Sequence, residues 1–92
     1  MLIYVSCDWN DAEKAKTITN ELQIDDRQNC YICPILAFSH LTDKDMTESE
    51  KMEICLDLLS VCDMLIVANE NTLWESKEVE FANMVGMEVH YL

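Results

Sequence analysis

The chain has 92 residues, half of them hydrophobic, and a formal net charge of −12. This length accommodates one hydrophobic core, and no apolar run approaches the roughly 20 residues of a membrane-spanning helix, so we expect a single cytoplasmic domain that makes no membrane contact. The negative field opposes direct nucleic-acid binding and would suit a basic protein partner.

The charge is unevenly distributed along the chain. Residues 1–46 hold eight of the 18 acids and four of the six bases, and residues 47–92 hold the remaining acids and bases. An anionic ligand would therefore need a local pocket that reverses this field.

The first half of the chain predicts two strands and one helix. Residues 2–6 form an apolar run rich in β-formers, which is typical of a buried central strand. Asn10 and Glu13 have the spacing of a helix start, and apolar residues then recur at helical intervals, which predicts a helix over about 11–22. A strand over 30–36, with Pro34 at its end or at the sheet edge, precedes a loop over 37–46.

A middle helix is predicted from a capping-box pattern. Thr47 and Glu50 have the required spacing, and the apolar residues that follow cover most of the circumference of the helix up to Cys62. One sheet face needs less apolar surface than this, so we expect self-association through this helix, most simply as a homodimer.

The remaining residues predict a strand, a helix and a last strand. Residues 64–68 form an apolar run that is typical of a buried strand, and a turn over 69–71 follows them. Thr72 and Glu75 repeat the capping-box spacing before a helix over about 73–85 that ends at Gly86. Residues 88–92 complete the chain as a fourth strand.

Strands and helices therefore alternate along the whole chain. This alternation predicts an α/β fold, a small Rossmann-like (flavodoxin-like) three-layer sandwich around a short, mainly parallel four-stranded sheet. Sheets of this type bind ligands outside the carboxyl ends of their strands. The loops expected at that edge are 7–10, 37–46 and 69–74.

Five cysteines without a secretory signal predict reduced, mostly buried thiols. Cys30 and Cys33 have the spacing of half a zinc site, but no second pair follows them. We expect neither a metal ion nor a cofactor.

Glu78 is the most informative single position for function. It falls on the same helical stripe as Ala82 and Val85, which would turn its carboxylate toward the sheet near the start of the last helix. A carboxylate there suits an anionic nucleophile or a ligand for sugar hydroxyls. The alternative is a glutamate at the boundary of the stripe that reaches solvent.

Several motifs together resemble the nucleoside 2-deoxyribosyltransferase-like superfamily, particularly its short branch of uncharacterised bacterial and phage domains. The resemblance spans nearly the whole chain. It rests on Ile3-Tyr-Val-Ser-Cys7, Cys33-Pro34 before a loop with Phe38, Glu50-Lys51 leading to Leu58-Leu59-x-x-Cys62-Asp63, and Glu78-x-Glu80-x-Ala82-x-x-x-Gly86.

The resemblance implies roles for three residues. Glu78 matches the helix-borne glutamate that attacks the anomeric carbon of a nucleoside, and Tyr4 matches a strand tyrosine that holds this nucleophile, although a buried core tyrosine explains Tyr4 equally well. Ser6 matches a small residue that lets the ligand approach the backbone. Transferases of this group complete their sites across subunits, which also favours a dimer.

The chain departs from the family pattern in three places. Thr72-Leu73-Trp74 replaces Ser-x-Gly before the last helix, Asn69 replaces an acidic residue, and Ser49 replaces an arginine at the start of the middle helix. Trp74 and Trp9 would then either stack on a nucleobase or pack locally or across a subunit interface.

Three functions fit these observations. The first is a nucleoside- or nucleotide-binding domain with an incomplete catalytic constellation, whose ligand contacts come from Ser6, Trp9, Asn69, Thr72 and Trp74. The second is an active N-glycosidic bond hydrolase or transferase that uses Glu78 as its nucleophile. The third is an acidic phage-type interaction or inhibitor protein with a basic partner.

Overall fold

The computed structural model describes residues 1–8, 10–38, 41–42, 44–68 and 73–92, and the side chains of all these except 73–75. The elements in chain order are β1 (Leu2–Ser6), α1 (Ala12–Asp25), β2 (Cys30–Ile32), α2 (Ile35–Phe38), α3 (Glu48–Ser60), β3 (Met64–Val67), α4 (Leu73–Met84) and β4 (Glu88–Tyr91).

The strands form one sheet in the order β2-β1-β3-β4, and every pair of neighbours is parallel. The interior position of β1 follows from its sequence, because its residues Ile3, Tyr4 and Val5 are each only 1% exposed. Leu65 on β3 pairs with Tyr4 on one side and with Val89 on the other. The α/β sandwich with a four-stranded sheet is therefore confirmed.

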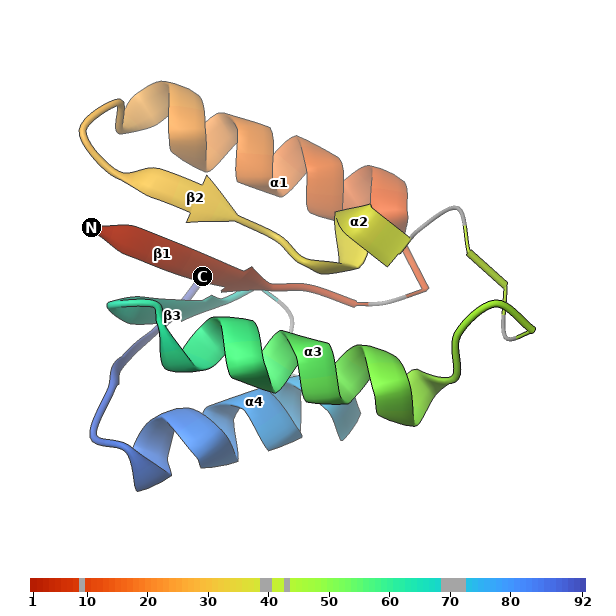
Figure 1. The fold of residues 1–92 in the computed structure, drawn as a ribbon. Coiled ribbons are helices and arrows are strands. Elements are labelled where there is room, and N and C mark those ends of the chain that lie inside the picture. Colours follow the sequence, from red (N-terminus) through yellow and green to blue (C-terminus); the bar gives the residue numbers. More distant parts are fainter. Residues whose placement is uncertain (9, 39–40, 43, 69–72) are drawn as a thin grey trace.

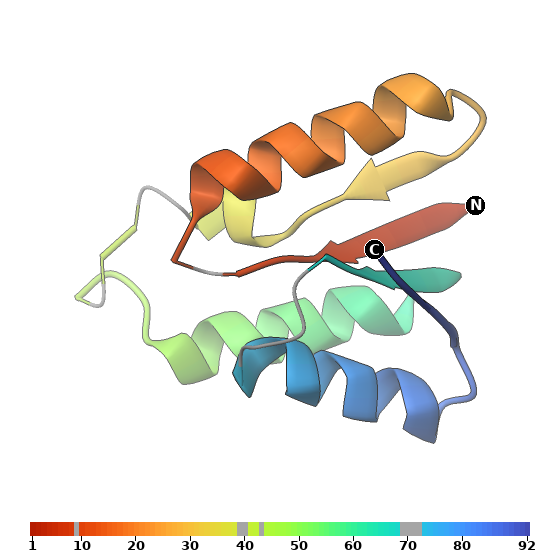
Figure 2. The ribbon, with the colours of Figure 1, turned by 180° about the vertical axis from the view of Figure 1, so that it is seen from behind.

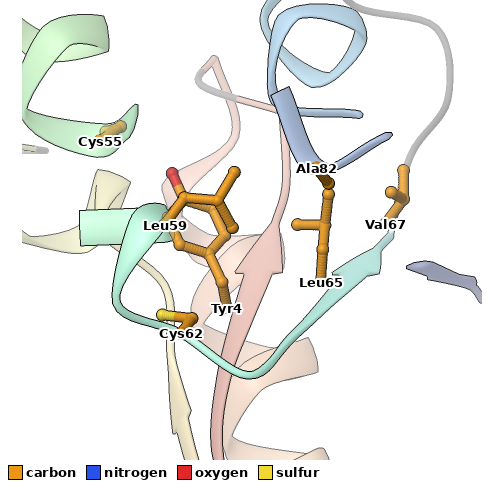
Figure 3. Packing of buried hydrophobic residues seen from close by; sticks show 7 residues of the cluster. All are labelled: Tyr4, Cys55, Leu59, Cys62, Leu65, Val67 and Ala82. Carbon is orange, nitrogen blue, oxygen red and sulfur yellow. The ribbon is translucent and has the colours of Figure 1, made fainter. Parts of the chain in front are cut away.

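Helices cover the two faces of the sheet unequally. The α1 helix and the short α2 lie on one face, while α3 and α4 run side by side on the other (Figures 1 and 2). Side chains alternate across each strand, so Val5 and Cys7 pack toward α1, whereas Tyr4, Leu65 and Val67 pack toward α3 and α4 (Figure 3). Two separate apolar clusters result, one on each face.

Helix ends follow local sequence, with one correction. The Thr47–Glu50 capping box is present at α3, and Gly86 has a φ of +74° after α4, as expected for a left-handed helix end. At α1 the N-cap is Asp11, not Asn10, because the Asp11 carboxylate accepts from the backbone N–H of Lys14.

The second strand is shorter than the sequence predicts. It ends at Ile32, and residues 35–38, which the apolar pattern assigned to a strand end and a loop, form α2. Pro34 explains the difference, since its fixed φ and missing N–H suit the residue that precedes a helical turn better than a strand. Within the described ranges, no helix is long and apolar enough to cross a membrane.

The core of α3 gives a direct stability test. Leu59 is fully buried against Tyr4 and Leu65, whereas Ile54 on the same helix is 43% exposed. We expect Leu59→Ala to lower the free energy of unfolding by roughly 2–5 kcal/mol. Ile54→Ala should change it by less than about 1 kcal/mol. Urea denaturation followed by circular dichroism measures both, and equal losses would contradict this packing.

Candidate functional site

The first three residues of the candidate site come from two elements on the α3–α4 side of the sheet. Tyr4 and Ser6 lie two residues apart on β1 and therefore share one face, and Ser6 is the last residue of that strand. Glu78 lies in the second turn of α4, which begins at the same edge of the sheet where β1 ends (Figure 2). The fold thus brings a carboxylate beside two hydroxyls from a sequence-distant strand.

Glu78 faces inward, as its helical stripe predicts. Its side chain is 1% exposed, and the Ser6 hydroxyl, itself on a residue that is 1% exposed, donates a hydrogen bond to Oε1 at 3.0 Å. The alternative of a boundary glutamate that reaches solvent is wrong. Ala82 shares the stripe and is fully buried, but Val85 lies beyond the end of α4 and is 55% exposed.

Tyr4 serves both the core and the site. Its ring belongs to the apolar cluster on the α3–α4 face (Figure 3). Its hydroxyl interacts with Glu78 and Cys55. Burial raises the pKa of the Tyr4 hydroxyl well above its ordinary value, and the charge on Glu78 raises it further. Tyr4 therefore stays protonated and available as a hydrogen-bond donor to the carboxylate.

The cysteines around the site have unequal acidities. Burial is the main cause that raises the pKa of the Cys55 thiol to about 11. On the other face of the sheet, hydrogen bonding to Cys7 is the main cause that lowers the pKa of Cys33. Five free cysteines are present, four buried and Cys30 exposed, so the expectation that most of the thiols are buried is confirmed.

Of the seven residues predicted for the site, the structure brings together Tyr4, Ser6 and Glu78. Trp74 is in the first turn of α4, but its side chain is not described. Three other predictions, Trp9, Asn69 and Thr72, fall outside the described residues.

Sequence reasoning missed two residues on α3. Cys55 contacts the Tyr4 hydroxyl, and Lys51, one turn earlier on the same helix, is 8% exposed despite its charge. The signal was present in the sequence, since Lys51 stands four residues before Cys55 and therefore on the stripe that also contains Leu59.

A separate hollow lies along α4. Its volume is about 760 Å³, and it lies away from the carboxylate of Glu78. It is lined by Val67, Ser76, Val79, Glu80, Asn83, Met84 and Tyr91. We place the candidate site at Glu78 rather than in this hollow, because convergent buried polar groups mark a chemical site more specifically than volume does.

The geometry defines an α/β domain with a buried carboxylate at the carboxyl edge of a parallel sheet. No family model, curated protein or solved structure matches the chain. In the described part of the chain, no group of three or more histidine, cysteine or acidic side chains is arranged to hold a metal ion.

The raised thiol pKa of Cys55 predicts a pH dependence of stability. Its pKa is about 11 in the folded state against 9.0 for an ordinary thiol, so the folded state retains a proton that the unfolded state loses. The stability it contributes is complete below about pH 9 and is lost as the pH rises toward 11. Cys55→Ala should flatten the fall of unfolding free energy over this interval.

Cys30→Ala is the matched control, because Cys30 is exposed. Urea titrations at several pH values between 8 and 11 would give the slope for each protein. A Cys55→Ala slope equal to that of the unmodified protein would contradict the assignment.

Proposed function

We propose that this domain binds a nucleoside or nucleotide at the carboxyl edge of its sheet, with Glu78 facing the sugar. The observation that carries the proposal is the buried Glu78 carboxylate held by Ser6 and Tyr4. The motifs shared with nucleoside 2-deoxyribosyltransferase-like proteins support the same position. Carboxylate oxygens accept hydrogen bonds from sugar hydroxyls. Contacts with Ser6 and Tyr4 would orient this carboxylate for such hydrogen bonds.

The cost of burial supports a functional role for Glu78. Removing an ionised carboxylate from water is expensive, and an apolar residue of similar size would fill the same space without that cost. Strongly buried acids are concentrated at functional sites for this reason. Hydrogen bonding from Ser6 and Tyr4 offsets part of this cost, and a hydroxyl of the bound sugar would offset more of it.

Cleavage of an N-glycosidic bond is the second candidate, and the Tyr4 hydroxyl on Glu78 favours it. The carboxylate would attack the anomeric carbon as the bond to the base breaks, and the base would leave with the electron pair of that bond and take a proton from solvent water. Water then yields the free sugar, or a second base yields a new nucleoside. A hydroxyl donor that fixes the carboxylate would serve either outcome.

The proposal extends to a cytoplasmic homodimer. On α3, Ile54 is 43% exposed, and Val61, which caps the C-terminus of this helix, is 66% exposed; both are apolar. A second copy packed on this helix would cover them. An acidic inhibitor of a basic protein is the alternative function, and the net charge of −12 is the observation in its favour.

Ligand-induced stabilisation tests the proposal directly. A thermal-shift panel of nucleosides and their phosphates should contain at least one ligand that raises Tm, since a ligand at 100 times its Kd stabilises a native protein by about 2.7 kcal/mol. Glu78→Gln should reduce that rise because it removes the charge while keeping the shape. Glu80→Gln, at an exposed position on the same helix, should leave the rise intact.

A panel without any stabilising compound would reject the proposal in favour of the acidic interaction protein. Catalysis is read separately, by chromatography of released base from any ligand that binds. Release by the unmodified protein and its loss in Glu78→Gln would support the N-glycosidase, and equal rates in the two proteins would exclude Glu78 as the nucleophile.

A further inference from the structure

The two outer strands of the sheet differ in how their free edges are covered. β2 and β4 each have one neighbour, so each has a row of backbone N–H and C=O groups that points away from the sheet. Open rows of this kind bind other strands, and proteins commonly cover them or place lysine or proline on them. Within the described residues, the chain covers the edge of β2 and leaves that of β4 open.

A glutamine of α1 covers the edge of β2. The Cys30 N–H donates toward β1, so the backbone groups of Asn29 and Tyr31, at the alternate positions, point outward. Gln23 Oε1 accepts from the Tyr31 N–H at 2.9 Å. Gln23 Nε2 donates to the Asn29 carbonyl at 2.8 Å. This side-chain amide therefore makes the two hydrogen bonds that a further strand would make.

The edge of β4 has no such cover in the part of the chain that the structure describes. The Leu92 N–H donates to the Val67 carbonyl at 2.9 Å, so the backbone groups of Leu92 and His90 point toward β3. Those of Val89 and Tyr91 therefore point outward, and no described residue bonds to them. The strand also contains neither lysine nor proline. Its edge is open to pairing.

The surface beside this edge is apolar on one face and polar on the other. Val89 and Tyr91 lie on the α3–α4 face, where Tyr91 borders the hollow along α4. Glu88 and His90 alternate with them and lie on the opposite face of the sheet. The apolar side chains at the ends of α4 and β4 that are more than half exposed are Met84, Val85, Tyr91 and Leu92.

The polar face of β4 is complementary to a second copy of itself. His90 Nε2 lies 2.8 Å from Glu88 Oε1, and both side chains are exposed. In an antiparallel pair of β4 strands with its twofold axis at Val89, Glu88 of each copy lies opposite His90 of the other. An axis at His90 would instead place two histidines opposite each other and Glu88 opposite Leu92. Complementarity of charge and hydrogen bonding therefore favours the axis at Val89.

We infer that β4 is an interaction surface on which a second copy of this chain adds its own β4 in antiparallel orientation, so that two four-stranded sheets become one. The two Val89 residues would exchange backbone hydrogen bonds across the axis. The Tyr91 N–H of each copy would donate to the Met87 carbonyl of the other, while the Met87 N–H stays bonded to Ala82 of its own chain. The Tyr91 and Met87 side chains would also meet on the apolar face.

This contact goes beyond the proposed function and depends neither on the sugar site nor on the α3 surface. A chain that paired through β4 alone would be a dimer, and one that also used α3 would be a tetramer. Loss of the β4 contact would halve the mass in either case.

Charge reversal with rescue tests the surface, with the mass measured by analytical ultracentrifugation. Glu88→Lys should halve the mass of the assembly, because it places a lysine opposite His90 of the other copy. Glu88→Lys combined with His90→Glu should restore the mass, since the charges are exchanged but still lie opposite each other. Glu21→Lys, the same change at an exposed position of α1, should leave the mass unchanged.

Amide hydrogen exchange gives a second test that needs no variant. In concentrated protein the N–H groups of Val89 and Tyr91 should exchange slowly, and dilution should accelerate them because it separates the copies. The N–H groups of His90 and Leu92 should stay protected on dilution, since they point toward β3 within one chain. Their protection in Glu88→Lys would also show that this variant is folded.

Three results would overturn the inference. The first is a monomeric unmodified protein, or rapid exchange of the Val89 and Tyr91 amides in concentrated protein. The second is a Glu88→Lys variant with undiminished mass; if Ile54→Glu on α3 then halves the mass, the dimer belongs to α3. The third is a double variant that stays dissociated, because the antiparallel pair with its axis at Val89 requires rescue.

Discussion

A carboxylate buried against the centre of a parallel sheet constrains everything around it. Glu78 is 1% exposed, so its oxygens depend on donors supplied by the protein, and the nearest come from β1. That strand can supply Ser6 and Tyr4 only because it is interior, with β2 on one side and β3 on the other. The interior position in turn requires the apolar side chains of β1 and the two-layer helical cover that buries them.

The same arrangement puts one tyrosine between the two helices of this face. Tyr4 stands between α3 and α4, and its hydroxyl interacts with Cys55 on one helix and Glu78 on the other. Lys51, on α3, is one helical turn before Cys55, whereas Glu78 is on α4.

Periodicity predicted the order of elements, the interior strand and the inward direction of Glu78, because each depends on residues close in sequence. The same is true of the Thr47–Glu50 capping box. Two predictions were wrong because a neighbouring residue decides the local structure. Asp11, not Asn10, is the N-cap of α1, and Pro34 ends β2 early and is followed by α2. The contact of Tyr4 with Cys55 joins two distant elements, and the burial of Lys51 contradicts the ordinary behaviour of lysine, so neither followed from spacing alone.

The hydrogen bond between Ser6 and Glu78 joins residues 72 positions apart. During synthesis, the first strand therefore leaves the ribosome long before its carboxylate partner exists, and β1 must also wait for β3 to cover its second edge. Contacts of such wide separation slow folding, because the intervening chain must be ordered first. A chain cut short before α4 would therefore have the hydroxyls without the acid.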